Sequence, residues 1–251
     1  MDESVAWRGS PLAQTAPPPL VQVTGLAKAY GEEVALADIS FQIEPGKVLG
    51  IIGPNGAGKT TLLEALAGLL PADAGVVCCR GRPIPAAQRR DAMFYVPDGI
   101  RPYQDQYVAH VLAFFAGAYR RPSDVIAEVI AATGLETVLR RRVRALSKGY
   151  GRRLLLALGL LAPHDVVLMD EPFDGFDPRQ TRDVVSLLRR EAANGRSLVL
   201  AIHQLADAER VCDRFVLLSQ GRLRGCGTLA ELRTRTDLAS AGLEEIFLAL
   251  T

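Results

Sequence analysis

A phosphate-binding loop constrains this chain more than any other feature. Residues 53–61 match the pattern Gly, four residues, Gly-Lys-Ser/Thr. They are Gly53, Pro54, Asn55, Gly56, Ala57, Gly58, Lys59, Thr60 and Thr61. The loop lies between an apolar run at 48–52 and a helical pattern at 62–67, which is the strand–loop–helix context that the motif requires. A Gly-rich turn that only connects strand to helix is the alternative, but it needs neither the lysine nor the threonine. We therefore expect the chain to bind a nucleoside triphosphate.

The residue types in this loop suit phosphate chemistry. Glycines allow backbone N–H groups to turn toward phosphate oxygens without a Cβ in the way. The helix that begins near Lys59 points the positive end of its dipole at the same place. Lys59 would supply a cation for the β- and γ-phosphates, and the Thr60 hydroxyl would ligate Mg²⁺.

An acidic pair ends a second apolar run. Residues 165–170 are almost continuously apolar, which is typical of a parallel strand buried on both faces. The run ends in Asp170, and Glu171 comes next. Acidic residues at the carboxyl end of a strand are well placed to hold Mg²⁺ beside a phosphate loop. Asp170 is therefore a predicted metal ligand, and Glu171 could polarise a water molecule for attack on the γ-phosphate. An exposed acidic turn is the alternative.

Two more polar positions are candidates for the site. His203 closes the predicted strand 197–202, where an imidazole could reach the γ-phosphate, although a structural histidine is the alternative. Ser147 and Gly149 precede a helical pattern at 152–162, and an ordinary helix N-cap is the alternative there. The basic residues around them, which include Arg152, are usually a solvated face; phosphate attraction or a basic contact surface are the other possibilities.

Composition excludes several classes of protein. Of 251 residues, 49% are hydrophobic, which is enough for a large core, and the net charge of +1 gives no bias toward nucleic acid. The four cysteines have no metal-binding spacing and favour a reducing cytoplasm. No run approaches the roughly 18–20 apolar residues of a membrane span. The first residues show no export signal, and 1–19 are expected to be a mobile tail.

The alternation of strand and helix patterns predicts an α/β fold. We expect a P-loop NTPase core with a mostly parallel sheet, an antiparallel β edge and an inserted helical subdomain. The expected boundaries are one domain over 20–251, with its core at about 20–83 and 163–235, the helical subdomain at about 84–162 and a C-terminal helix at about 242–250.

The order of these motifs resembles a known family. Over about residues 20–219 the chain resembles the ABC-type ATPases, the nucleotide-binding subunits of ABC transporters. The resemblance rests on four motifs that follow one another along the chain: residues 53–61, 146–150, 168–172 and His203. The combination of Leu-Ser-x-Gly with Asp-Glu-Pro is more specific than the phosphate loop alone.

The resemblance implies roles for individual residues. Tyr30 would stack on adenine, with Val34 beside it. Ser147 and Gly149 would belong to the signature that completes the site of a partner subunit. In the same scheme Asp170 is the Mg²⁺ ligand, Glu171 the catalytic base and His203 the switch histidine.

Two departures from the family pattern stand out. The signature usually reads Leu-Ser-Gly-Gly-Gln, but Lys148 and Tyr150 replace a Gly and the Gln. Because the Ser and the second Gly are retained, we expect function to survive. Asp98 stands where the family has a Gln; its carboxylate could reach Mg²⁺, but it adds negative charge near the phosphates and predicts a modest loss of γ-phosphate sensing.

The resemblance implies an ATP-hydrolysing subunit with ATP and Mg²⁺ as cofactors. It would pair with a second ATPase subunit, either another copy or a close relative, and drive a separate transmembrane permease chain from the cytoplasmic face of the cell membrane. Residues 243–251 look like the tail helix of the exporter-type branch, so export is favoured. No nucleic-acid partner is expected. One alternative is a soluble ABC ATPase that acts on ribosomes or DNA, and another is a regulatory subunit that binds ATP without hydrolysing it.

Overall fold

The computed structural model describes residues 18–251. The predicted mobile tail at 1–19 therefore lies outside the described residues, apart from Pro18 and Pro19. The strands are β1 Val21–Tyr30, β2 Glu33–Ile43, β3 Val48–Ile52, β4 Ala74–Cys79, β5 Arg82–Pro83, β6 Met93–Val96, β7 Val166–Asp170, β8 Ser197–Ile202, β9 Arg214–Ser219 and β10 Arg222–Gly227. The helices are α1 Lys59–Ala67, α2 Ala86–Arg89, α3 Val108–Ala118, α4 Ser123–Thr133, α5 Lys148–Leu161, α6 Pro178–Ala193, α7 Leu205–Val211, α8 Leu229–Thr236 and α9 Leu243–Leu250.

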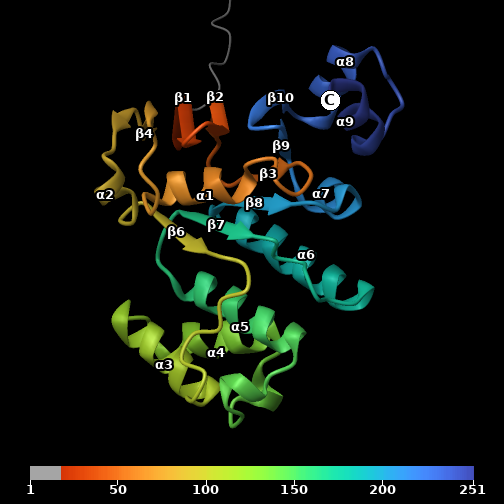
Figure 1. Ribbon diagram of the computed structural model, residues 1–251. Helices are drawn as coiled ribbons and strands as arrows, with labels where there is room; N and C mark the ends of the chain where they lie inside the picture. Colours follow the sequence, from red (N-terminus) through yellow and green to blue (C-terminus); the bar gives the residue numbers. More distant parts are fainter. Residues whose placement is uncertain (1–17) are drawn as a thin grey trace, which may run out of the picture.

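The strands form one sheet in the order β5-β4-β1-β2-β10-β9-β3-β8-β7-β6. Strands β9, β3, β8, β7 and β6 are parallel neighbours, whereas β5, β4, β1 and β2 pair antiparallel at the other end. The expected α/β class, with a mostly parallel sheet and an antiparallel edge, is confirmed. In Figure 1 the antiparallel strands β1, β2 and β4 lie above α1, whereas the parallel strands β8, β7 and β6 lie below it.

Helix α1 is buried between these two parts of the sheet. Leu62, Leu63 and Leu66 on it are fully buried and belong to one apolar cluster with residues of β1, β2, β3 and β7. Burying three leucines contributes roughly 2 kcal/mol each. This packing fixes the start of α1, and with it the phosphate loop, against the carboxyl end of β3.

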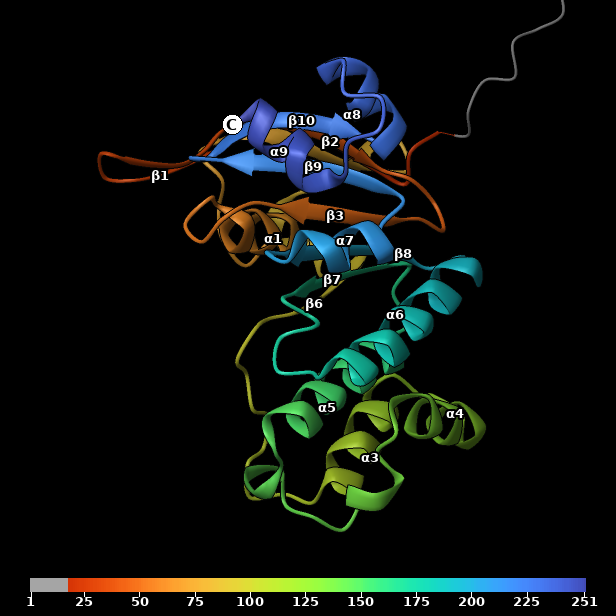
Figure 2. The ribbon, with the colours of Figure 1, turned by 90° about the vertical axis from the view of Figure 1, so that its right-hand side faces the viewer.

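The helical insertion begins later than the sequence predicts. Within the range 84–162, residues 93–96 form β6, which pairs in parallel with β7 and belongs to the core. A four-residue apolar run that ends at Pro97 carries no clear period, so a buried strand is easily mistaken for a helix segment. The helices α3, α4 and α5 follow and pack on one another around their own apolar cluster, away from the antiparallel strands (Figure 1; Figure 2).

Capping groups set the ends of several helices. Helix α5 begins at Lys148 rather than at residue 152, because the Ser147 side chain accepts a hydrogen bond from the Tyr150 N–H at 3.3 Å. Thr228 and Glu231 form a capping box that starts α8, a helix the sequence analysis did not predict. The C-terminal helix α9 packs against α7 and α8 (Figure 2).

Between residues 18 and 251, no helix has both the length and the apolar character needed to cross a membrane.

Candidate functional site

The phosphate loop is held by close backbone packing at two glycines. A Cβ on Gly58 would lie 2.5 Å from the Ala35 carbonyl oxygen, and its φ of +100° is one that side chains rarely adopt. A Cβ on Gly53 would collide with the Leu218 carbonyl oxygen. The loop therefore fits against β2 and β9 only because these positions are glycines.

Lys59 and Thr60 start α1 and point to the same place. The buried Lys59 ammonium donates hydrogen bonds to the carbonyl oxygens of Gly53 at 2.9 Å and Pro54 at 3.3 Å, so it is folded over the loop. The Thr60 hydroxyl donates to Asp170 Oδ2 at 2.7 Å. Residues that are 110 positions apart in the chain thus meet at the end of β7.

Asp170 is buried at the carboxyl end of β7. Burial raises the pKa of its carboxyl group, and the nearby charge of Asp98 acts in the same direction. The Thr60 hydrogen bond and the charges of Lys59 and Arg152 oppose this and lower the pKa. A bound cation would lower the pKa of Asp170 further, because a positive charge favours the ionised carboxylate.

Glu171 connects the loop to His203. Its carboxylate oxygen Oε1 lies 3.7 Å from Lys59 Nζ, and Oε2 lies 2.6 Å from His203 Nδ1. The residue has a φ of +48°, which is uncommon for a side chain larger than glycine. Its N–H donates to the Ala201 carbonyl oxygen at 3.0 Å, which ties this turn to β8. The unusual backbone aims the carboxylate into the site.

These groups share one open cavity of about 820 Å³. The expected site residues that line it are Tyr30, Val34, Asn55, Gly56, Gly58, Lys59, Thr60, Thr61, Asp98, Asp170 and Glu171. Tyr30 and Val34 stand at it with exposed fractions of 50% and 54%, so they offer apolar surface to a planar ring. Gly53, Pro54 and Ala57 shape the loop beside the cavity, and His203 joins it through Glu171.

Sequence reasoning missed six residues that line the same cavity: Glu33, Ala35, Glu64, Tyr95, Pro97 and Gln220. Tyr95 lies on β6, which was expected to be helical. Recognising the strand would have placed Tyr95 at the sheet edge that carries Asp170.

Ser147 and Gly149 do not reach this cavity within the chain. They lie at the start of α5, where Gly149 approaches Gln180 and Gly175. Their expected role in the site of a partner subunit stays a prediction.

Asp98 lines the cavity, but an arginine holds its carboxylate. Asp98 Oδ1 accepts a hydrogen bond from Arg152 Nη2 at 2.5 Å. The expectation that Asp98 ligates Mg²⁺ thus meets a competing partner from the basic run, for which a solvated face was favoured over phosphate attraction or a contact surface. Arg152 is in fact only 6% exposed.

The residues fit a nucleoside triphosphate with a divalent cation. The Thr60 hydroxyl and the Asp170 carboxylate provide adjacent oxygen ligands, which hard cations such as Mg²⁺ prefer. Lys59 supplies the positive charge beside the glycine loop, and the loop provides backbone N–H groups at a helix N-terminus.

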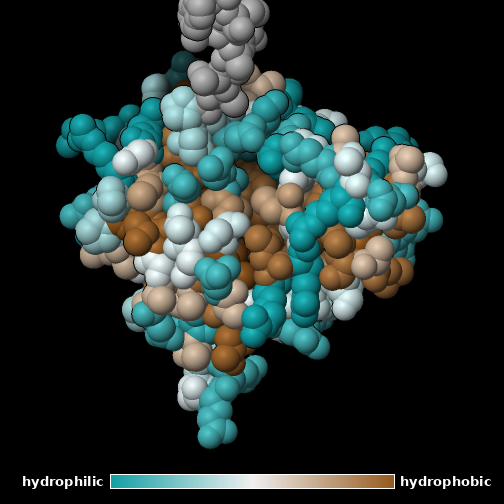
Figure 3. Space-filling view, turned by 90° about the horizontal axis from the view of Figure 1, so that it is seen from above, coloured by the Kyte–Doolittle hydropathy of each residue, from teal (hydrophilic) through white to brown (hydrophobic). Residues whose placement is uncertain are grey.

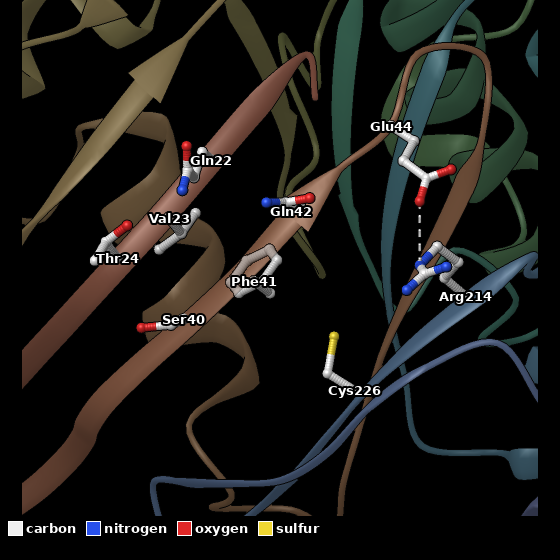
Figure 4. A pocket seen from close by; sticks show the side chains of 9 residues that line it. All are labelled: Gln22, Val23, Thr24, Ser40, Phe41, Gln42, Glu44, Arg214 and Cys226. Atoms are coloured by element: carbon white, nitrogen blue, oxygen red, sulfur yellow. Dashed lines mark ion pairs between the residues drawn. The ribbon is translucent and has the colours of Figure 1, made fainter. Parts of the chain in front are cut away.

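A second cavity is lined by residues of β1 and β2 together with Glu44, Arg214 of β9 and Cys226 of β10. The view from above in Figure 3 shows hydrophobic residues between hydrophilic ones on the end of the molecule that faces the viewer. The second cavity has a volume of about 410 Å³ and no residue of the phosphate loop lines it. Figure 4 shows its side chains, which include Gln22 and Gln42 and a 3.4 Å ion pair between Glu44 and Arg214. These groups are separate from the site of Lys59.

Comparison with known proteins agrees with this geometry. A family model described as ABC transporter matches residues 36–174, which is more than half of the chain. The Nod factor export ATP-binding protein I of Ralstonia nicotianae is 36% identical over 224 residues, covering 86% of this chain and 69% of that protein. In two further Nod factor export relatives the chain spans 66% and 61% of the length.

Two other matches cover nearly whole chains. The ABC-type transporter ATP-binding protein EcsA of Bacillus subtilis is 29% identical over 238 residues, which are 92% of this chain and 96% of that one. A solved ATP binding subunit of an ABC transporter has a TM-score of 0.84 and 28% identity, and the match covers 92% of this chain and 99% of that one.

Proposed function

Because the chain belongs to the ABC transporter family of ATP-binding subunits, we propose that it drives a separate membrane permease in the direction of export. The subunit is an ATPase of this family. One observation carries the ATPase part of the proposal: a single cavity is lined by the phosphate loop, by the Thr60–Asp170 pair and by Glu171, which His203 contacts from outside the lining.

The nucleotide would bind along the cavity from Tyr30 to Glu171. Tyr30 and Val34 offer apolar surface for the base at one end. The loop N–H groups and Lys59 bind the phosphates, since both present positive charge to an anion. Thr60 and Asp170 hold Mg²⁺, which when bound neutralises charge on the phosphate oxygens.

Glu171 accepts a proton from the attacking water in this proposal. Its contact with His203 Nδ1 fixes the carboxylate, and its distance of 3.7 Å from Lys59 keeps it close to the phosphate end of the site. A general base must lie within hydrogen-bond reach of the water that it activates. His203 keeps Glu171 in that orientation and can contact the γ-phosphate through its other ring nitrogen.

A second ATPase subunit would complete each site. Ser147 and Gly149 are at the N-terminus of α5 but away from Lys59 of their own chain. The N-terminus of a helix attracts anions. In a head-to-tail pair these residues would cover the γ-phosphate bound by the partner.

An exposed apolar patch supports a permease partner. Its centre is the contact between Tyr103 and Phe114, and the exposed residues Ile100 and Tyr107 belong to the same segment before α3. Tyr103 and Phe114 are 52% and 59% exposed, and their ring centroids lie 5.5 Å apart. Exposed aromatic residues that gather in this way mark interaction surfaces. We assign the patch to a cytoplasmic segment of the permease, which would hold the subunit at the inner face of the membrane.

Export rests on the relatives and on α9. The similar proteins of Ralstonia nicotianae and of two other bacteria are named for Nod factor export. The C-terminal helix Leu243–Leu250 resembles the tail helix of the exporter-type branch, which supports this direction.

The catalytic assignment is tested by replacing Glu171 with Gln. We expect Glu171→Gln to bind ATP and to lose at least about 100-fold in turnover, the lower range for a general base. Glu33→Gln is the matched control, because Glu33 is an exposed carboxylate of the same cavity and does not contact His203. Full ATPase activity of Glu171→Gln would refute the role of Glu171.

The partner assignment is tested by co-purification from detergent-solubilised membranes. Tagged Glu171→Gln chain with ATP should recover a polytopic membrane protein, and adding Phe114→Asp should remove it while ATP binding persists. Leu69→Asp is the control, because Leu69 is at least as exposed as Phe114 but lies after α1, outside the patch. Recovery of ribosomal or DNA-bound proteins in place of a membrane protein would overturn the permease proposal.

A further inference from the structure

Arg152 is a buried arginine beside the nucleotide cavity. It lies in the second turn of α5 with an exposed fraction of 6%. Its Nη2 contacts Asp98 Oδ1 at 2.5 Å and lies 3.7 Å from Asp174 Oδ2, and its Nε donates to the Asp174 carbonyl oxygen at 3.4 Å. A buried guanidinium without carboxylate partners would be costly. The contacts identify Asp98 as its nearest charged partner.

The cavity has far more negative than positive charge. Among residues 18–251 its lining includes the carboxylates of Glu33, Glu64, Asp98, Asp170 and Glu171 and a single cationic side chain, that of Lys59. A polyphosphate adds further negative charge to this space. Like charges at a protein surface repel more strongly than in bulk water, because the effective dielectric constant there is lower. Asp98 therefore opposes nucleotide binding unless another group neutralises it.

We propose that Arg152 is a positioning residue that holds and neutralises Asp98, so that a carboxylate at this place is compatible with ATP. The inference rests on the proposed ATP-binding function. It also assigns Asp98 to the ion pair and not to the metal. Arg152 stands behind Asp98 and does not line the cavity, so it acts on the nucleotide through Asp98.

Lys148 leaves Arg152 free for this role. Asp174 could compete for the guanidinium, but its Oδ2 accepts a hydrogen bond from Lys148 Nζ at 2.8 Å. That contact is the main reason why the pKa of Asp174 is lowered from its usual value. The Lys148 stem also packs on Gly175. Both departures from the family pattern, at 98 and 148, thus belong to one charge network that links the segment after β6, the turn after β7 and the start of α5.

The network makes a counterintuitive prediction about the family residue. Asp98→Gln restores the usual Gln, yet it leaves Arg152 buried with its nearest carboxylate removed, so we expect this variant to be less stable than the wild type. Arg152→Gln leaves Asp98 unneutralised, and we expect the affinity for ATP to fall roughly tenfold, with a rise in KM and a smaller change in kcat. The double variant Asp98→Gln with Arg152→Gln removes both charges, and its affinity should return to within about threefold of the wild type.

The test measures binding of a fluorescent ATP analogue to the full chain, with and without Mg²⁺, at low and high salt. The loss in Arg152→Gln should be present without Mg²⁺ and should shrink at high salt, because the repulsion is electrostatic. Arg153→Gln is the control: Arg153 donates to the Thr133 carbonyl oxygen and packs on the Phe176 ring, so its loss should lower thermal stability without changing ATP affinity.

Three results would overturn the inference while the wild type still binds ATP: unchanged affinity in Arg152→Gln, no recovery in the double variant, or a Mg²⁺ requirement that rises in the double variant as expected for a lost metal ligand. If Arg152→Gln does not fold, Arg152→Lys replaces it and should keep Mg²⁺-free affinity within about threefold, because the charge is retained. A tenfold loss in Arg152→Lys would count against neutralisation. Failure of the wild-type chain itself to bind ATP would instead refute the proposed function.

Discussion

The two loop glycines Gly56 and Gly58 differ in their surroundings, which allows a matched comparison. Both have positive φ, +80° for Gly56 and +100° for Gly58. A Cβ on Gly56 would meet nothing within 4 Å. A Cβ on Gly58 would lie 2.5 Å from the Ala35 carbonyl oxygen and 3.1 Å from Leu36 Cδ2. Substituting each with Ala therefore separates backbone strain from steric conflict.

The expected costs follow from these contacts. A positive φ costs a non-glycine residue about 1–2 kcal/mol, so Gly56→Ala should lower the free energy of unfolding by about that amount. Gly58→Ala carries the same strain and also forces apart α1 and the backbone of β2. Overpacking of this kind costs about 1–3 kcal/mol. The total for Gly58→Ala is then about 2–5 kcal/mol.

Urea denaturation of the nucleotide-free protein measures the difference. Nucleotide is left out because it binds only the folded state and would mask the change. Both variants should shift the midpoint without changing the slope, with Gly58→Ala displaced further. Equal midpoints for the two variants would show that the approach of Gly58 to β2 does not contribute, and the argument from packing would fail.

Three further predictions address buried polar groups and a helix cap. Ser197→Ala should lower the free energy of unfolding, measured by urea titration, by about 2 kcal/mol. The fully buried hydroxyl accepts a hydrogen bond from the Gly46 N–H at 3.0 Å and donates one to the Glu44 carbonyl oxygen. A decrease below about 0.5 kcal/mol, the size of a surface substitution, would refute this. Tyr95→Phe should raise the thermal midpoint, since the buried Tyr95 hydroxyl makes no hydrogen bond of good geometry within residues 18–251 although the Asp170 carboxylate lies nearby; a lower midpoint would show that it bonds to Asp170. In the α8 capping box, the Thr228 N–H lowers the pKa of Glu231, so this carboxylate stabilises the fold above its unfolded pKa and loses that effect as pH falls through its folded pKa. The stability gap between the wild type and Glu231→Gln should therefore narrow from pH 7 toward about pH 4, and a constant gap would contradict the linkage.

Local chemistry made much of the fold and site predictable. The phosphate loop requires particular residues at fixed spacing between a strand and a helix, so residues 53–61 reveal it without any tertiary information. The buried runs 165–170 and 197–202 could be recognised as parallel strands because they are apolar on both faces, and parallel strands bring their carboxyl ends to one edge. Lys59, Asp170 and Glu171 were therefore expected to meet before their distances were known.

Contacts between distant segments were decided by the tertiary structure alone. Short apolar runs such as Met93–Val96 have no period of their own, and only pairing with β7 makes this one a strand. A run of arginines looks alike whether it faces solvent or a carboxylate, so the burial of Arg152 against Asp98 could not be inferred from spacing. Sequence determines which groups are available and which local conformations they favour. The packing of α5 against the core determines which charged side chains are desolvated and therefore need a partner of opposite charge.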